Sequence, residues 1–299
     1  MGHMGYLYIA LTLAAWTIIA FVYKGADRAS SNRLWLAAMF GLVVAVGNIA
    51  LALSKGIDLT CSIHSQYIIG IALALVSVGG LPAFMAAVQR GDLSITWTVM
   101  TLSFALASLL SIIYPGERPT VWGIIGLLIA GAAVVLLGMD MHSRNQDQSK
   151  VKPGRGWGLY MALSFLTNTY SMYSYTLSDH FNPDKTPEGR TAFLLSYGLV
   201  LFLLSAVLAL ALKKQGSASA GVKWGLAGGA LIFTGSLFTL LAKNDAGVLG
   251  SVLFPITTGG SNVLVVALSV LFLKERPGRY GWFGLGAGAL AIVLLGTAA

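Results

Sequence analysis

Ten apolar stretches follow one another along the chain, and the Gly, Pro, Asp, Asn, Lys and Arg residues gather in the short segments between them. A helix that crosses a bilayer needs about 20 predominantly apolar residues. Each stretch is about that long, so the pattern predicts ten membrane-spanning helices. The expected spans cover residues 5–23, 34–53, 66–89, 93–114, 119–138, 157–178, 191–212, 222–242, 247–272 and 279–297.

The composition supports a membrane protein and excludes a nucleic-acid-binding one. Of the 299 residues, 56% are hydrophobic and 10% are charged, whereas soluble domains carry about 25% charged residues. Lipid can solvate such a surface, because a helix satisfies its own backbone polar groups. The net charge of +8 comes from basic residues in separate short loops, which form no continuous basic face. We therefore expect a lipid bilayer as a partner and no nucleic acid.

The two halves of the chain resemble each other. The triplets Glu117-Arg118-Pro119 and Glu275-Arg276-Pro277 are 158 residues apart, and the segments 135–138 and 293–296 match at the same offset. The beginnings of the halves match at an offset of 152, where Thr17 corresponds to Thr169. We therefore predict a first five-helix repeat at 5–138, a cytoplasmic linker at 139–156 and a second five-helix repeat at 157–297.

An odd number of spans per half predicts that the second half enters the membrane from the opposite face. Such inverted repeats are a common construction in secondary transporters. The loops after spans 1, 3, 5, 7 and 9 hold 14 of the 19 Lys and Arg residues, and cytoplasmic loops carry the excess of these residues. The expected fold is an all-α membrane protein of two inverted five-helix repeats, with both termini outside the cytoplasm.

These features resemble the drug/metabolite transporter superfamily, in particular its ten-span EamA-type branch. The resemblance rests on the doubled five-span unit, the turn Leu273-Lys274-Glu275-Arg276-Pro277 and the glycine-rich segment 281–286 that follows it. It implies that spans 1, 3, 4, 6, 8 and 9 line a central cavity. It also implies export of amino acids or other metabolites, or import of choline and similar small solutes, across the plasma (inner) membrane.

Charged residues are absent from the interior of the predicted spans. An ionisable group inside the membrane would be a functional candidate by default. Its absence disfavours a proton relay through a buried carboxylate and leaves recognition to aromatic faces, hydroxyls, amides and backbone groups. The spacing of the His and Cys residues resembles no metal site, and we expect neither a metal nor a cofactor.

Span 6 is the most polar of the ten and is a candidate lining of a substrate site. Its candidate residues share a helix with Ser164 and Thr169, and the offset of 152 pairs Asn168 with Trp16 of span 1. The alternative is that these amides and hydroxyls only join helices together. The substrate-binding candidates in spans 1 and 6 are Trp16, Thr17, Asn168, Tyr170, Ser171, Tyr173 and Tyr175.

Span 9 contains Pro255, Gly259 and Gly260, which weaken a helix. Transporters expose backbone to substrate at broken helices, so Thr258 and Asn262 are further binding candidates, with Pro255 and Gly259 as hinge candidates. Trp97 in span 4 lies opposite Pro255 at the offset of 158. Pro82 in span 3 is a third hinge candidate. Close helix packing through small residues is the alternative at each position.

The sequence favours a secondary transporter that moves a small metabolite by alternating access, and not an enzyme. A cation–π cage of Trp16, Trp97, Tyr170 and Tyr173 would suit a quaternary ammonium substrate, which leaves a choline-like importer as an alternative. A lipid-modifying membrane enzyme or a channel is the alternative from another class. We expect a monomer or weak dimer. Asn48 and Tyr197 are expected to make helix–helix hydrogen bonds.

Overall fold

In the computed structural model, residues 3–58, 63–90, 100–146, 156–212, 216–273 and 278–298 are described, and every regular element in these ranges is a helix. Five helices are long and apolar enough to cross a membrane. These observations confirm the all-α class and fit a membrane location. The five segments are Met4–Arg28, Arg33–Lys55, His64–Ala87, Pro187–Ala211 and Ala218–Asn244.

Each of the ten predicted spans overlaps a helix. The elements are α1 (His3–Arg28), α2 (Arg33–Lys55), α3 (His64–Arg90), α5 (Ser103–Ile113), α6 (Val121–Gln146), α7 (Trp157–His180), α8 (Pro187–Ala211), α9 (Ala218–Asn244), α10 (Gly250–Phe254), the π-helical turn η1 (Pro255–Gly259), α11 (Gly260–Leu273) and α12 (Arg279–Ala298). Helix α6 continues to Gln146, so the first part of the segment predicted as a linker is helical.

Side-chain caps begin α2, α8 and α9. The Asn32 side chain accepts hydrogen bonds from the backbone N–H groups of Leu34 and Trp35 at the start of α2. Thr186 caps α8 by accepting from Gly189, and Ser217 caps α9 by accepting from Ala220. Each cap satisfies backbone donors that have no partner inside the helix. The polar residues between the apolar stretches therefore fix where these helices start.

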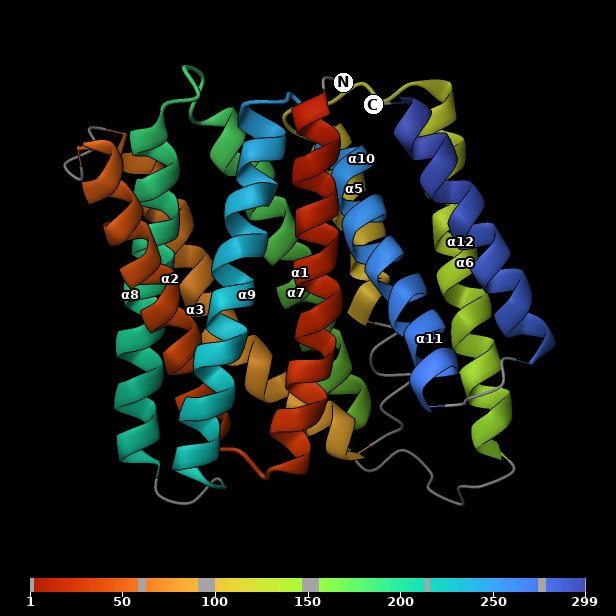
Figure 1. The fold of residues 1–299 in the computed structure, drawn as a ribbon, viewed down its shortest axis with the longest axis horizontal. Coiled ribbons are helices and arrows are strands. Elements are labelled where there is room, and N and C mark those ends of the chain that lie inside the picture. Colours follow the sequence, from red (N-terminus) through yellow and green to blue (C-terminus); the bar gives the residue numbers. More distant parts are fainter. Residues whose placement is uncertain are drawn as a thin grey trace. The chain divides into compact units, whose positions relative to one another are not determined.

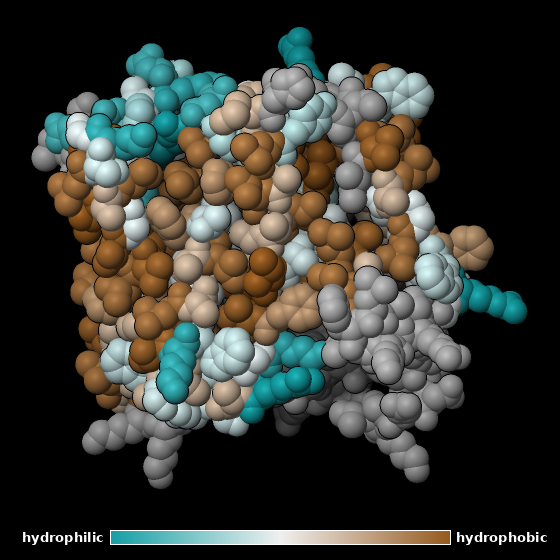
Figure 2. All heavy atoms as spheres, viewed as in Figure 1, coloured by the Kyte–Doolittle hydropathy of each residue, from teal (hydrophilic) through white to brown (hydrophobic). Residues whose placement is uncertain are grey.

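Helix α8 is apolar on its buried and its exposed face. Leu201 is buried, while Leu203, Val207 and Leu210 are exposed. A helix that is hydrophobic all round belongs in a protein core or a membrane. Figure 2 shows hydrophobic residues over the middle of the helices on the visible face, with hydrophilic residues gathered near helix ends. This pattern is what a lipid-facing helix requires.

The chain forms two compact units. Unit 1 contains Ala83–Tyr173 and Val248–Ala299, and unit 2 contains Gly2–Pro82 and Ser174–Gly247. Each unit takes segments from both sequence halves, so the compact units differ from the repeats predicted at 5–138 and 157–297. One boundary between them falls at Pro82, where α3 remains helical.

Within unit 2, α2 packs antiparallel to α8 (Figure 1). A Cβ atom on Gly198 would lie 2.6 Å from the Ala45 backbone nitrogen, and a Cβ on Gly41 would lie 2.4 Å from that of Phe202. Only glycine permits such an approach of two backbones. Small residues at helix contacts are the usual device for packing helices in a membrane.

Helix α9 packs against two neighbours in unit 2. It runs antiparallel to α1, since Gly25 faces Trp224 and Tyr8 stacks on Phe238 with ring centroids 5.8 Å apart. Its glycine-rich face lies along α2, where Gly225 faces Met39. The α1, α2, α8 and α9 helices thus form the helical core of unit 2.

Within unit 1, α6 and α12 lie side by side and run antiparallel (Figure 1). Gly126 near the start of α6 faces Leu295 near the end of α12. At the opposite end, the backbone N–H of Gly278 donates to a carboxylate oxygen of Asp140 at 3.0 Å. Asp140 is buried and satisfies a donor at the beginning of α12.

Candidate functional site

Three elements of unit 1 bring polar side chains together. Asn168 on α7 donates its Nδ2–H₂ group to Ser103 Oγ at 2.7 Å and to the Met100 carbonyl at 3.3 Å. A carbonyl can only accept, so the amide nitrogen faces α5 and the Asn168 carbonyl oxygen points elsewhere. In the part of the chain that the structure describes, that oxygen accepts no hydrogen bond. Asn168 is half-buried.

Span 9 supplies the second group of polar side chains. The Thr258 hydroxyl lies 3.9 Å from the Met172 sulfur on α7. One turn further along, Asn262 is buried with 2% of its surface exposed, and its Nδ2 has no hydrogen-bond partner among the described residues. A buried amide N–H without a partner is uncommon because it has lost its water without replacement. We name Ser103, Asn168, Met172, Thr258 and Asn262 the amide cluster.

A π-helical turn positions Thr258 and Asn262. Proline at 255 has no N–H, so the chain at this point cannot make a regular α-helical ladder. The backbone stays helical, and the Gly260 N–H lies within reach of the carbonyls of Pro255, Ile256 and Thr257. The proline and glycines therefore do not break the helix. Instead, η1 widens it locally while the backbone stays helical. Such π-bulges are frequent at functional sites.

The remaining candidates of spans 1 and 6 divide between the units. In unit 2, the Tyr175 hydroxyl lies 2.7 Å from Ser236 Oγ on α9, and Tyr175 packs edge-on against Phe193. The Trp16 ring lies against Gly235, next to Ser236. Trp16 and Tyr175 thus meet the same segment of α9. The predicted meeting of Trp16 with Asn168 would join unit 2 to unit 1 and stays a prediction.

Several predicted hydroxyl groups bond to their own helix. Thr17 donates to the Leu13 carbonyl at 2.7 Å, and Ser171 donates to the Thr167 carbonyl at 2.9 Å. Asn48 does the same with the Val44 carbonyl at 2.8 Å, whereas a bond to another helix was expected. These donors already make hydrogen bonds within their own helices. They are therefore less available to bind a ligand than the amides of the amide cluster.

Tyr173, Tyr170, Trp97 and Gly259 are further candidates from spans 6, 4 and 9. The Tyr173 hydroxyl donates to the Tyr114 carbonyl at 2.9 Å, so its donor is engaged. Tyr170 is half-buried on α7. Trp97 lies outside the described residues, and the proposed aromatic cage therefore stays a prediction. Gly259 contacts the Phe104 ring, 3.6 Å from where a Cβ would lie, which is ordinary packing.

A buried ionisable side chain lies at the end of α9, one residue beyond the predicted span 8. Lys243 is 2% exposed. The sequence pattern ended span 8 at residue 242, but α9 continues to Asn244. Asn244 is also buried, and neither atom of its amide has a hydrogen-bond partner among the described residues. A buried lysine at the end of an apolar helix is costly unless it has a role, so Lys243 is a functional candidate.

The first Glu-Arg-Pro triplet has a structural role that the sequence did not reveal. The two carboxylate oxygens of Glu117 accept from the backbone N–H groups of Gly250 and Ser251, both at 2.8 Å. Glu117 thus neutralises free donors at the start of α10, immediately before the π-helical turn. A residue of the first half therefore holds the beginning of span 9 in the second half.

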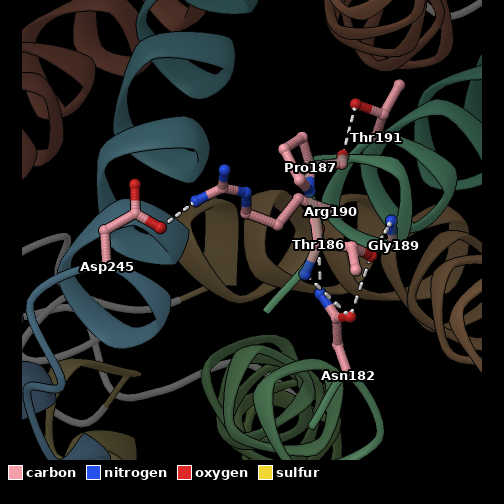
Figure 3. Close-up of polar contacts among 7 residues, drawn as sticks. All are labelled: Asn182, Thr186, Pro187, Gly189, Arg190, Thr191 and Asp245. Atoms are coloured by element: carbon pink, nitrogen blue, oxygen red, sulfur yellow. Dashed lines mark hydrogen bonds and ion pairs between the residues drawn. The ribbon is translucent and has the colours of Figure 1, made fainter. Parts of the chain in front are cut away.

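The segment between α7 and α8 is tightly bonded (Figure 3). The Asn182 side chain donates to the Thr186 carbonyl at 3.0 Å and accepts from the Thr186 N–H at 3.2 Å. Nearby, Arg190 on α8 forms an ion pair with Asp245 after the end of α9. These contacts make the segment a tightly bonded connector between the two helices. In the described ranges, no group of three His, Cys, Asp or Glu side chains could hold a metal ion.

Comparison with known proteins establishes the fold alone. No family model matches the chain, and no curated protein matches it. Among solved structures, 28 chains match. One is the crystal structure of a protein that shares 18% sequence identity with this chain, with 99% of each chain covered and a TM-score of 0.68. At that identity, the likeness shows a common architecture over nearly the whole length.

Proposed function

We propose that the chain is a secondary transporter that moves a small uncharged or weakly polar metabolite across the plasma membrane by alternating access. The EamA-type resemblance and the two inverted five-span repeats belong to this proposal. Ten spans in two inverted halves would place a substrate site near the middle of the bilayer. The amide cluster is the part of that site that we assign to unit 1.

The observation that carries the proposal is the antiparallel pairing of helices at equivalent positions of the two sequence halves. Helices α2 and α8 hold the second expected span of each half, and α6 and α12 hold the fifth. Both pairs run antiparallel. Inverted repeats require this relation, whereas a channel built by repetition around the membrane normal would have parallel partners. The pairing therefore supports a carrier over a channel.

A polar cluster inside apolar helices supports the same proposal. The Asn262 amide is buried without a partner, and the Asn168 carbonyl oxygen is unused. In lipid, such groups are costly, and they are typical of substrate pathways. The π-helical turn beside them adds a local departure from α-helical geometry at which a span can bend.

The test is uptake into proteoliposomes that contain the purified full chain, with amino acids, amines including choline, amides and nucleosides as solutes. A carrier gives uptake that saturates with concentration. Uptake that rises linearly with concentration would favour a channel, and lipid turnover without uptake would favour an enzyme. Trp16→Ala and Asn168→Ala should each lower saturable uptake at least about tenfold, as expected when one buried hydrogen bond or aromatic contact is lost. Both variants should retain folded protein.

A further inference from the structure

We propose that the amide cluster recognises an uncharged amide edge on its ligand, that is, a C=O acceptor next to an N–H donor. Primary carboxamides and the lactam edges of nucleobases carry this pair. In this arrangement, Asn262 Nδ2 donates to the ligand carbonyl and the Asn168 carbonyl oxygen accepts from the ligand N–H. The inference deepens the proposed function, and it names the class of substrate for that same site.

Helix directions in unit 1 follow from four contacts. Asn168 bonds to Ser103, and Tyr173 bonds to the carbonyl of Tyr114, so α7 runs parallel to α5. Phe104 contacts Gly259, while Glu117 holds Gly250, so span 9 runs antiparallel to α5. Helix α7 and the η1–α11 segment are therefore antiparallel to each other.

The contact between Thr258 and Met172 then fixes which residues face each other. Asn262 lies four residues after Thr258, and Asn168 lies four residues before Met172. Residues four apart share a helix face and are separated by about 6 Å along the axis. In an antiparallel pair, both steps lead in the same direction. By this contact Asn168 lies level with Asn262, and by the Ser103 and Phe104 contacts it lies level with Gly259, so Asn168 is within about one turn of Asn262 along the helix axes.

The two amides have complementary unused groups. The Asn168 donors are engaged by Ser103 and the Met100 carbonyl, which leaves its oxygen as an acceptor. Asn262 has an unpartnered buried donor. One free acceptor and one free donor within about one turn of each other match a ligand that presents a donor and an acceptor side by side.

The surroundings favour a neutral ligand. The groups bonded to the cluster are a hydroxyl, a backbone carbonyl and a thioether, which carry no formal charge. The carboxylates of Glu117 and Asp140 in unit 1 are bonded to backbone N–H groups at helix ends. A charged ligand would lose its hydration here without a counter-charge, which is costly in a medium of low dielectric.

Binding of matched probes to the full chain in detergent micelles tests the inference, with isothermal titration calorimetry as the measurement. Nicotinamide has the amide edge, nicotinate replaces it by a carboxylate, and N,N-dimethylnicotinamide removes both N–H donors. We expect nicotinamide to bind at least about tenfold more tightly than either analogue, since each analogue leaves a buried group unpaired. Uracil and 1,3-dimethyluracil form a second pair with the same expected order.

Two variants locate the effect. Asn262→Leu and Asn168→Leu should each abolish the preference for nicotinamide over N,N-dimethylnicotinamide. Asn48→Leu is the matched control, because Asn48 is a buried asparagine whose amide bonds to its own helix in unit 2. It should leave the preference unchanged. The wild-type comparison does not depend on whether any variant folds.

Equal affinity for nicotinamide and its dimethyl analogue would overturn the inference, and so would failure of every amide probe to bind. If the chain still carried some other solute with saturation, the proposed function would survive without this substrate class. If no solute were carried with saturation, the proposed function would fail as well. Preference for the amide edge that persists in both Asn variants would place the recognition elsewhere and contradict the assignment of these residues.

Discussion

Two buried asparagines, Asn48 in unit 2 and Asn262 in unit 1, differ in whether their amide nitrogen makes a hydrogen bond. Asn48 of unit 2 donates to the carbonyl one turn back on its own helix. Asn262 of unit 1 has a buried amide nitrogen with no partner among the described residues. Asn48 lies on α2, which packs against α8 and α9 through glycine residues. Asn262 follows the π-helical turn η1.

The difference separates packing from recognition. The α2–α8 contact of unit 2 is built from close backbone approaches, and the Asn48 amide on α2 bonds to its own helix. The amide cluster of unit 1 retains unused hydrogen-bonding capacity at a cost in stability. Natural proteins tolerate such local violations mainly where function requires them. Variants in each unit should enlarge or abolish this contrast.

The largest effect is expected at the glycine contact of unit 2. Gly198→Ala places a Cβ 2.6 Å from the Ala45 backbone nitrogen. Backbone cannot move aside as a flexible side chain can, so we expect a loss of about 3 kcal/mol in unfolding free energy. The thermal unfolding midpoint in detergent measures it. Gly131→Ala in α6 is the control, because a Cβ there meets nothing within 4 Å. Equal midpoints for the two variants would refute the packing role.

Glu117→Ala should have the next largest effect. The change removes both acceptors for the Gly250 and Ser251 N–H groups at the start of α10. Hydrogen bonds to charged groups contribute about 2 kcal/mol each before non-additivity, so the unfolding midpoint should fall and saturable uptake should fall with it. Glu188→Ala in the first turn of α8 controls for loss of a carboxylate near a helix start. If Glu117→Ala behaved like this control, span 9 would need no anchor.

Lys243→Met tests whether the buried cation of α9 contributes to transport. Methionine keeps much of the aliphatic stem but removes the charge. Because ionisable groups inside a membrane are retained mainly for function, we expect at least a tenfold loss of uptake, which corresponds to about 1.4 kcal/mol. Lys185→Met, at an exposed loop position, should be neutral. Unchanged uptake with a lower unfolding midpoint would make Lys243 a purely structural residue.

The smallest effect is expected at the Arg190–Asp245 ion pair of unit 2 (Figure 3). The Asp245 side chain is 41% exposed, so water and salt screen the interaction. Asp245→Asn should cost less than about 1 kcal/mol at low salt and still less at high salt. A double-mutant cycle with Arg190→Gln isolates the pair. A coupling energy that does not change with salt would contradict the screened-surface interpretation.

Hydrophobic patterning along the chain predicted the helices well, because lipid demands long apolar stretches wherever a helix crosses. The all-α class is confirmed, and each expected span overlaps a helix. Helix ends were harder to predict. Polar residues such as Lys243 and Asp140 stay helical and buried when the surrounding protein supplies partners or cover, and an apolar pattern contains no information about that environment.

The sequence predicted some of the residues that form the candidate site, but it could not predict which hydrogen bonds they make. The density of polar residues in span 6, and Pro255 followed by Gly259 and Gly260 in span 9, led to Asn168, Thr258 and Asn262, which all lie in unit 1. Sequence could not show that Thr17 and Ser171 use their donors on their own helices. It also could not show that Glu117 anchors α10, because that contact joins residues 133 positions apart.

Counterflow in proteoliposomes tests the central claim, alternating access by a carrier, most directly. Vesicles containing the full chain are loaded with an excess of unlabelled solute and diluted into a trace of labelled solute, taken from those that show saturable uptake. A carrier exchanges one solute molecule for another, so the label should accumulate transiently above its equilibrium level. Label that only approaches equilibrium from below, whatever the internal concentration, would contradict the claim.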